Sequence, residues 1–372
     1  IVELYGSQVG SKILSFAPTG GEALMPFLII IGLQWFFQMN SDGTGYLAQR
    51  SMACATDRDA RIAGVVFAWM QIFARSILWL AIGVGLLVIY PFAADSVAGD
   101  QFAASREITF VNGIQDLLPI GIRGLMLTAL LAALASTIDT HLNWGASYWS
   151  NDIYQRLICK EWLKREPKSH ELVIAARLSN ILILIIALTI MANLGSIQTA
   201  WFISLLFGAG MGSVLVLRWL WERINLFSEL GAMAASLVVA PILLVVTDVE
   251  WIRLGTMAVV TTLIAIGITY LTPSTEANVL KEFYLRVRPL GFWRKTAALA
   301  GDDSGRSGQE FFKGLKTTAL TSISLFCLLL GVGKLLFSVP GTSILGAWMY
   351  VVVALALIPL WWQDAIGEKK ST

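Results

Sequence analysis

Two adjacent hydroxyl side chains, Ser136 and Thr137, lie in an otherwise apolar run of the chain and could bind a hard cation. Sodium is such a cation and prefers oxygen ligands. Two hydroxyls, joined by main-chain carbonyls of a facing broken helix, would form a weak and exchangeable sodium site. The alternative is structural, because Ser and Thr in apolar helices often donate to the carbonyl one turn earlier. The residues alone leave both interpretations open.

A second polar cluster interrupts an apolar helix near the start of the chain. The apolar run 24–37 is followed by polar residues and two glycines. The polar residues are Asn40, Ser41, Asp42 and Thr44. A broken helix exposes main-chain carbonyls and amides to a cavity, where transporters hold solutes and ions. The other interpretation is that the helix ends at Asn40 and that a loop follows.

A lone arginine, Arg75, lies near the middle of another apolar stretch. Its insertion into a membrane costs at least about 2.5 kcal/mol. We therefore expect Arg75 to face a polar cavity or to pair with a carboxylate, for which Asp42 and Asp139 are candidates. A structural ion pair without ligand contact is the alternative.

Two patterns look like enzyme motifs but lack the required context. The glycines of GAGMG at 208–212 lie in an apolar run with no strand before them, which indicates helix packing or bending rather than a nucleotide loop. Ser136, Asp139 and His141 are close in sequence, but no nucleophile elbow accompanies them, and a triad is defined by geometry. We predict no catalytic residue, no cofactor and no enzyme.

The composition shows which elements must position these residues. The chain is 56% hydrophobic and only 14% charged, whereas soluble domains carry about 25% charged residues. Apolar runs of 18 or more residues can cross the bilayer as helices, and in lipid the backbone must satisfy its own hydrogen bonds. The sequence predicts an all-α polytopic protein whose partner is the lipid bilayer. The net charge of +2 gives no indication of nucleic acid binding.

Nine apolar segments are candidates for transmembrane helices. They span residues 23–41, 62–90, 117–139, 177–194, 199–218, 229–247, 252–271, 317–337 and 344–362. If the N-terminus lies outside, 21 of the 27 Lys and Arg residues fall in inner loops. The positive-inside rule then predicts a cytoplasmic (inner) membrane protein with a cytoplasmic C-terminus. The longest inner loop, 273–316, contains a polar stretch at 301–310 that we expect to be flexible.

Together these segments resemble the sodium:solute symporter family, which includes sodium/glucose, sodium/proline and sodium/pantothenate transporters. One matching segment is YLAQRSMACATDRDARIAGVVFA at 46–68. Another is 118–156, with its specific strings GLMLTALLAALAST and NDIY. A weaker match covers 177–188 and the helix at 201–212, and the resemblance as a whole covers roughly 20–245.

The resemblance implies roles for the polar residues. In the family the paired hydroxyls bind sodium together with a nearby main-chain carbonyl, which maps the site onto Ala133, Ser136 and Thr137. The interrupted helix helps to form the solute site, which makes its four polar residues regional candidates. This sequence lacks the tyrosine that sugar-transporting members place there, which puts sugar in doubt. Asp139 is expected to tune the site or hold the inner gate, and Arg75 to be an intramembrane polar or gating residue.

The family fold is of the LeuT type, with two inverted five-helix repeats and peripheral helices. The resemblance then divides the chain into an extracytoplasmic segment (1–22), the second repeat (23–218) and peripheral C-terminal helices (219–372). The first repeat is absent from this sequence and is expected from the full-length chain. The chain alone is therefore expected not to transport.

The resulting prediction is sodium-coupled symport of a small organic solute by alternating access. One alternative is a symporter-like binding or sensor module that acts with a partner such as a kinase. The end of the chain at 366–372, without a signalling domain, favours the transporter. A membrane-embedded enzyme is a third alternative, but Arg75 and Asp139 have no obvious partner nucleophile.

Overall fold

The structure is a computed structural model that describes residues 1–15, 21, 24–36, 44–93, 99–303, 305–337 and 343–367. Regular structure in these residues consists of helices and one isolated β-bridge between Trp221 and Phe292. The prediction of an all-α protein is confirmed for the described part of the chain.

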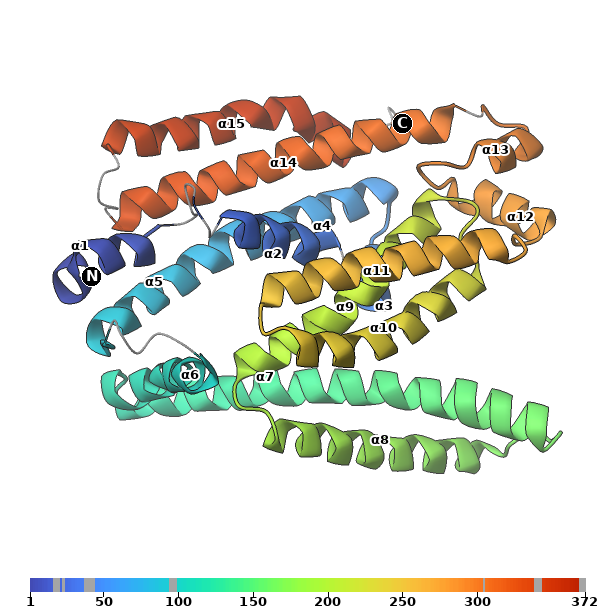
Figure 1. Ribbon diagram of the computed structural model, residues 1–372, viewed down its shortest axis with the longest axis horizontal. Coiled ribbons are helices and arrows are strands. Elements are labelled where there is room, and N and C mark those ends of the chain that lie inside the picture. The colour runs from blue at the N-terminus through green and yellow to red at the C-terminus, as the bar shows by residue number, and fades with distance from the viewer. Residues whose placement is uncertain are drawn as a thin grey trace. The chain divides into compact units, whose positions relative to one another are not determined.

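The part of the chain that the structure describes contains seventeen helical elements. Figure 1 shows how they follow one another. The first are α1 (Val2–Ile13), α2 (Leu24–Phe36), α3 (Thr44–Met52), α4 (Asp57–Trp69), a π-helical turn (Met70–Ala74) and α5 (Arg75–Ile89). Next come α6 (Gly99–Leu117), α7 (Ile120–Ser147), a π-helical segment (Tyr148–Trp162) and α8 (Ser169–Ala192). The last are α9 (Ile197–Leu220), α10 (Leu226–Val246), α11 (Glu250–Leu271), α12 (Ala277–Val287), α13 (Arg294–Ala300), α14 (Arg306–Phe337) and α15 (Ile344–Ile366).

Eight helices within the described residues are long and apolar enough to cross a membrane. They correspond to the predicted segments from 62–90 to 344–362. The remaining predicted segment is the first in the chain, 23–41. The structure describes it only over the 13 residues of α2, so its full span stays a prediction. These spans define a multi-pass membrane protein.

Several helices extend beyond their apolar runs. Helix α4 begins at Asp57, ahead of the predicted start at 62, because the Thr56 hydroxyl caps it by accepting the Asp59 N–H at 3.1 Å. The helix that starts at Ile120 continues to Trp162 over 43 residues, about twice the length needed to span a bilayer. The helix continues past the predicted apolar segment, which ends at 139, because hydropathy marks where a helix leaves lipid, whereas the backbone stays helical until it approaches Pro167.

Residues 95–200 form one compact unit that contains α6, α7 and α8. Helices α7 and α8 run side by side (Figure 1). Between them Arg165 donates to Glu171 at 2.8 Å, and this carboxylate raises the pKa of Arg165. At the other end of the unit, Glu107 accepts the N–H groups of Ile197 and Gln198, both at 3.1 Å, which caps the first turn of α9.

Residues 1–94 and 201–372 form the other unit, whose main core lies between α9, α10 and α11. Helix α9 packs closely here because it carries small residues. A Cβ added at Gly210 would lie 2.4 Å from Ser236 Oγ and 3.1 Å from Met257 Cε. The glycine run at 208–212 therefore serves helix packing, as predicted, in the way small residues do between membrane helices.

Buried hydroxyls join the same three helices. Ser228 and Thr269 share a hydrogen bond of 2.7 Å between α10 and α11, and Thr262 donates to Ser213 of α9 at 2.7 Å. Asn225 caps α10 by accepting the Ser228 N–H at 3.1 Å. Bonds of this kind hold membrane helices together, since lipid does not drive apolar helix faces against one another.

Helices α14 and α15 form a long antiparallel pair with a glycine at its contact (Figure 1). A Cβ added at Gly331 would lie 2.7 Å from Val351 Cγ2 and 3.0 Å from the Ala347 carbonyl oxygen. The two backbones can approach this closely only because position 331 has no side chain.

We expect Gly331→Ala to destabilise the protein by about 1–3 kcal/mol, because the added methyl group overpacks this contact. Gly308→Ala in the same helix is the matched control, since a Cβ there meets nothing within 4 Å. Thermal unfolding of the two purified variants in one detergent measures the difference. An equal midpoint would show that the pair can move apart without cost.

The predicted inner loop folds into a small structure, which we call the loop cap (residues 273–303). Tyr284, Trp293 and Ala297 form its buried core. Glu222, two residues after the end of α9, accepts the Thr296 N–H at 2.9 Å and the Thr296 hydroxyl at 2.8 Å. The predicted flexible stretch 301–310 was wrong over its second half, because α14 begins at Arg306, where Arg306 pairs with Glu310 at 3.0 Å.

The loop cap should loosen at acid pH through Asp302. The Asp303 N–H, followed by the Tyr284 hydroxyl, stabilises its carboxylate and lowers its pKa. A lowered folded-state pKa contributes stability above the ordinary aspartate value of about 4, and this stability is lost as pH falls through the folded-state pKa. We expect faster amide exchange at Ala297–Gly301 in that acid range, after correction for intrinsic rates. Asp302→Asn should remove this acid-induced rise in the exchange rate. A rise that persists in the variant would assign the effect to another group.

Candidate functional site

The candidate ion site lies on one face of α7. At about 100° per residue, positions three and four apart share a helix face, so Ala133, Ser136 and Thr137 lie together. All three side chains are exposed in the described part of the chain. The helix therefore presents two hydroxyls and a main-chain carbonyl along one line.

The Thr137 hydroxyl donates to the Ala133 carbonyl at 3.0 Å, as the structural interpretation predicts. This bond leaves the hydroxyl ligands of the ionic interpretation available, because a hydroxyl has one donor and two acceptor lone pairs. The two lone pairs of the Ala133 carbonyl are both engaged, since this oxygen also accepts the Thr137 N–H within the helix. The bond fixes the Thr137 oxygen with its lone pairs free to accept, so the two interpretations are compatible.

Ser136 differs from Thr137 in its hydrogen bonding. Its carbonyl accepts the Thr140 hydroxyl at 2.9 Å. Its own hydroxyl has no hydrogen-bond partner among the residues that the structure describes. The pair therefore combines one oriented hydroxyl with one that is free to turn toward a ligand.

Asp139 lies on an adjacent face, about 120° around the helix from Ala133. Its carboxylate accepts the Asn143 amide at 2.9 Å. His141 places Nδ1 2.8 Å from the Thr137 carbonyl, so Ser136, Asp139 and His141 do not assemble a triad. Asp139 is thus beside the hydroxyl pair, where a carboxylate would act on an ion through its field rather than as a ligand.

The predicted solute residues fall at a gap between described segments. Asn40, Ser41 and Asp42 lie outside the described residues, and Thr44 is the first residue of α3. Helices α2 and α3 flank the predicted interruption. The role of these four residues stays a prediction.

Arg75 is the first residue of α5 and directly follows the π-helical turn Met70–Ala74. Such turns inside α-helices often occur at functional sites. Its side chain is exposed and has no partner within the described residues. Asp42 lies outside those residues, and a pairing with Asp139 would join the two units, so both pairings stay predictions.

Sequence reasoning missed the polar face that continues beyond Thr137. Thr140, His141, Asn143 and Ser147 each bond to a group one turn earlier, Ser147 to the Asn143 carbonyl at 2.8 Å. The signal was present, because these residues follow the hydroxyl pair at helical spacing in THLNWGAS. The predicted apolar segment ended at 139, ahead of these residues.

The fold and this polar helix define a multi-pass membrane protein with a candidate ion site inside one span. The family model of the sodium:solute symporter family matches residues 12–239. The chain belongs to this family. Its matched residues include the whole of α7 and the interrupted region before α3.

Curated relatives agree with this assignment. The chain is 28% identical over 179 residues to the sodium/proline symporter of Salmonella typhimurium, a match that covers 47% of this chain and 34% of that protein. It is 28% identical to the sodium/glucose cotransporter of Vibrio parahaemolyticus, with 46% and 32% covered. It is 33% identical over 139 residues to the osmoregulated proline transporter OpuE of Bacillus subtilis, with 36% and 25% covered.

The matches thus cover about a third or less of the length of these relatives. No solved structure matches the chain. These relatives are named as symporters, cotransporters and transporters, which are transport proteins rather than enzymes.

Proposed function

We propose that the protein takes part in sodium-coupled uptake of a small organic solute across the cytoplasmic membrane. The observation that carries the proposal is the exposed line of oxygen ligands at Ala133, Ser136 and Thr137 on a membrane-spanning helix of a symporter family member. Sodium bound there would raise solute affinity, and by linkage the solute would raise sodium affinity by the same factor. Sodium is cargo in this scheme, and no resident cofactor is proposed.

Solute binding is assigned to the region of Asn40, Ser41, Asp42 and Thr44, with Arg75 and Asp139 as polar or gating residues. Residues 23–218 would form the second repeat and residues 219–372 the peripheral helices, with the first repeat supplied by the full-length chain. Alternating access then requires one helix bundle to rock against the other.

The proposed topology has residues 1–22 outside and the C-terminus in the cytoplasm. It rests on the excess of Lys and Arg in the loops assigned to the inner side. The loop cap carries several of them, namely Lys281, Arg286, Arg288, Arg294 and Lys295. The inner membrane is the location that this charge bias supports.

Proteoliposomes that contain the full-length protein test the function. Proline and glucose are the probes, since the relatives are named for these two solutes. Uptake of one of them that requires an inward sodium gradient, and that stops when potassium replaces sodium, would support symport. Sodium-dependent binding without uptake would favour the alternative of a binding or sensor module. Uptake that is indifferent to sodium would refute the coupling.

A further inference from the structure

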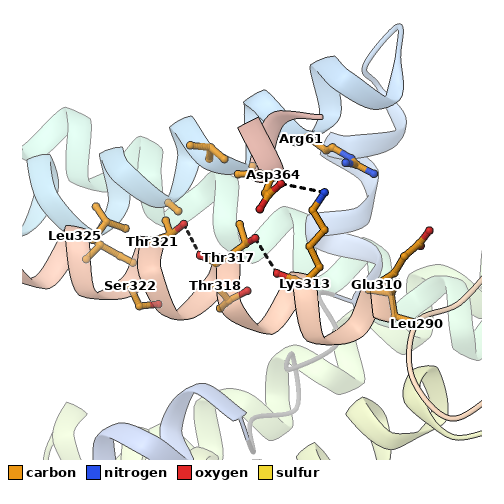
Figure 2. A pocket seen from close by; sticks show the side chains of 16 residues that line it. Arg61, Leu290, Glu310, Lys313, Thr317, Thr318, Thr321, Ser322, Leu325 and Asp364 are labelled. Carbon is orange, nitrogen blue, oxygen red and sulfur yellow. Dashed lines mark hydrogen bonds and ion pairs between the residues drawn. The ribbon is translucent and has the colours of Figure 1, made fainter. Parts of the chain in front are cut away.

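A cavity of about 700 Å³ opens between α4, the π-helical turn, α14 and α15, all within one unit (Figure 2). It is within the usual size of a small-ligand site, about 300–1,000 Å³. The residues that line it come from helices far apart in sequence, such as Arg61 of α4, Lys313 of α14 and Asp364 of α15. Helices α14 and α15 lie beyond the residues that the family model matches.

One end of the cavity is charged, and its charges balance. Lys313 Nζ lies 3.0 Å from Asp364 Oδ1, with the Arg61 guanidinium beside them (Figure 2). Glu310 lines the same end and pairs with Arg306 at 3.0 Å. Arg61 has no ion pair within the described residues. The lining thus offers two cations and two carboxylates, which suits a ligand that carries both signs.

The polarity of the lining falls along α14 away from this end. Side-chain hydroxyls follow the charged residues along α14. Two of these hydroxyls donate to carbonyls one helical turn earlier: Thr317 to the Lys313 carbonyl at 2.9 Å, and Thr321 to the Thr317 carbonyl at 2.8 Å. The far end is apolar and includes Ile72 and Leu325. From Lys313 to Leu325 the helix rises about 18 Å, close to the half-thickness of about 15 Å for bilayer hydrocarbon.

We propose that this cavity binds an aminophospholipid, with a phosphatidylethanolamine headgroup at the charged end and an acyl chain along α14. The phosphate would contact Arg61 and Lys313, because guanidinium and ammonium groups bind phosphate through charge-assisted bonds. The primary ammonium would donate to Asp364 and Glu310. The hydroxyls are placed for the ester region, and the apolar end for the chain. A soluble ligand would not account for a graded cavity as long as one leaflet.

The test compares three dioleoyl lipids on the purified full-length protein in detergent. Phosphatidylethanolamine carries an ammonium that donates, phosphatidylcholine carries one that cannot donate, and phosphatidylglycerol carries none. Native mass spectrometry measures the fraction of protein with bound lipid. We expect about two- to fivefold tighter binding of the ethanolamine lipid than of either other lipid, the range for a partly exposed ion pair. Equal binding of all three would overturn the proposal, and a preference for phosphatidylglycerol would assign the cavity to anionic lipid.

Two variants locate the binding. Arg61→Gln should weaken all three lipids, and Glu310→Gln should remove only the preference for ethanolamine over choline. Both side chains are exposed, so neither change removes a packed core group. Glu282→Gln is the matched control, because Glu282 pairs with Arg286 at the same helical spacing but outside the cavity. Two outcomes would refute this site. One is lipid binding that changes as much in the control as in the test variants, and the other is lipid binding that changes in neither test variant.

Discussion

Sodium dependence of uptake should be lost when Ser136 and Thr137 are both replaced by alanine in the full-length protein. Each hydroxyl would contribute an oxygen ligand, and the Ala133 carbonyl alone is too few ligands for a hard cation. We expect the sodium concentration for half-maximal uptake to rise by tenfold or more, equivalent to at least about 1.4 kcal/mol of binding free energy. The loss follows from the ligand count, because the substitution leaves the helical backbone bonds intact.

The matched control is Thr128→Ala, which lies about 1.4 turns of α7 before Ala133. Thr128 bonds back to the Gly124 carbonyl at 2.9 Å, as Thr137 does to Ala133, but it lies about 140° around the helix from Ala133. Thr137→Ser should keep most of the sodium dependence, since it keeps the hydroxyl. Sodium titration of solute uptake compares all of these variants. An unchanged sodium requirement in Ser136→Ala with Thr137→Ala would place the ion site elsewhere.

The transmembrane segments could be predicted from sequence because each depends on a local property. A run such as 229–247 must be helical in lipid whatever surrounds it, and α10 is found at Leu226–Val246. The hydroxyl pair could be predicted for the same reason. Polar residues in an apolar run are visible without knowledge of their neighbours.

The loop cap and the lipid cavity could not be predicted because each depends on contacts between distant residues. Glu222 caps α13 at Thr296, and no local pattern at either position indicates the other. Likewise Lys313 and Asp364 meet only because α14 and α15 pack as a pair. Hydropathy reports how a residue interacts with lipid or water, but it does not report which helices adjoin.

The loop cap should undock from α9 when Gly291 is replaced by alanine. Gly291 has φ +101°, a conformation that L side chains rarely adopt, and forcing one into it costs about 1–3 kcal/mol. A Cβ there would also lie 2.5 Å from the Leu220 carbonyl oxygen. That oxygen accepts the Phe292 N–H at 2.6 Å, so relief of the clash would break the contact that docks the cap.

The variant Gly301→Ala separates the two causes of undocking, which are backbone strain and the clash with the Leu220 carbonyl. Gly301 also has a positive φ, +77°, but a Cβ there meets nothing within 4 Å. The control therefore carries backbone strain without the clash. Trypsin cleavage after Arg286 and Arg294 in the purified protein measures opening of the cap, because cleavage tracks the population of the open form. We expect cleavage about tenfold faster or more in Gly291→Ala than in Gly301→Ala, since each 1.4 kcal/mol lost to the clash raises the open population tenfold.

Equal cleavage rates in the two variants would mean that backbone strain alone accounts for the undocking and that Leu220 moves aside without cost. A cap that opened in neither variant would show that Glu222 and the Trp293 indole, which donates to the Trp219 carbonyl at 2.8 Å, hold it by themselves.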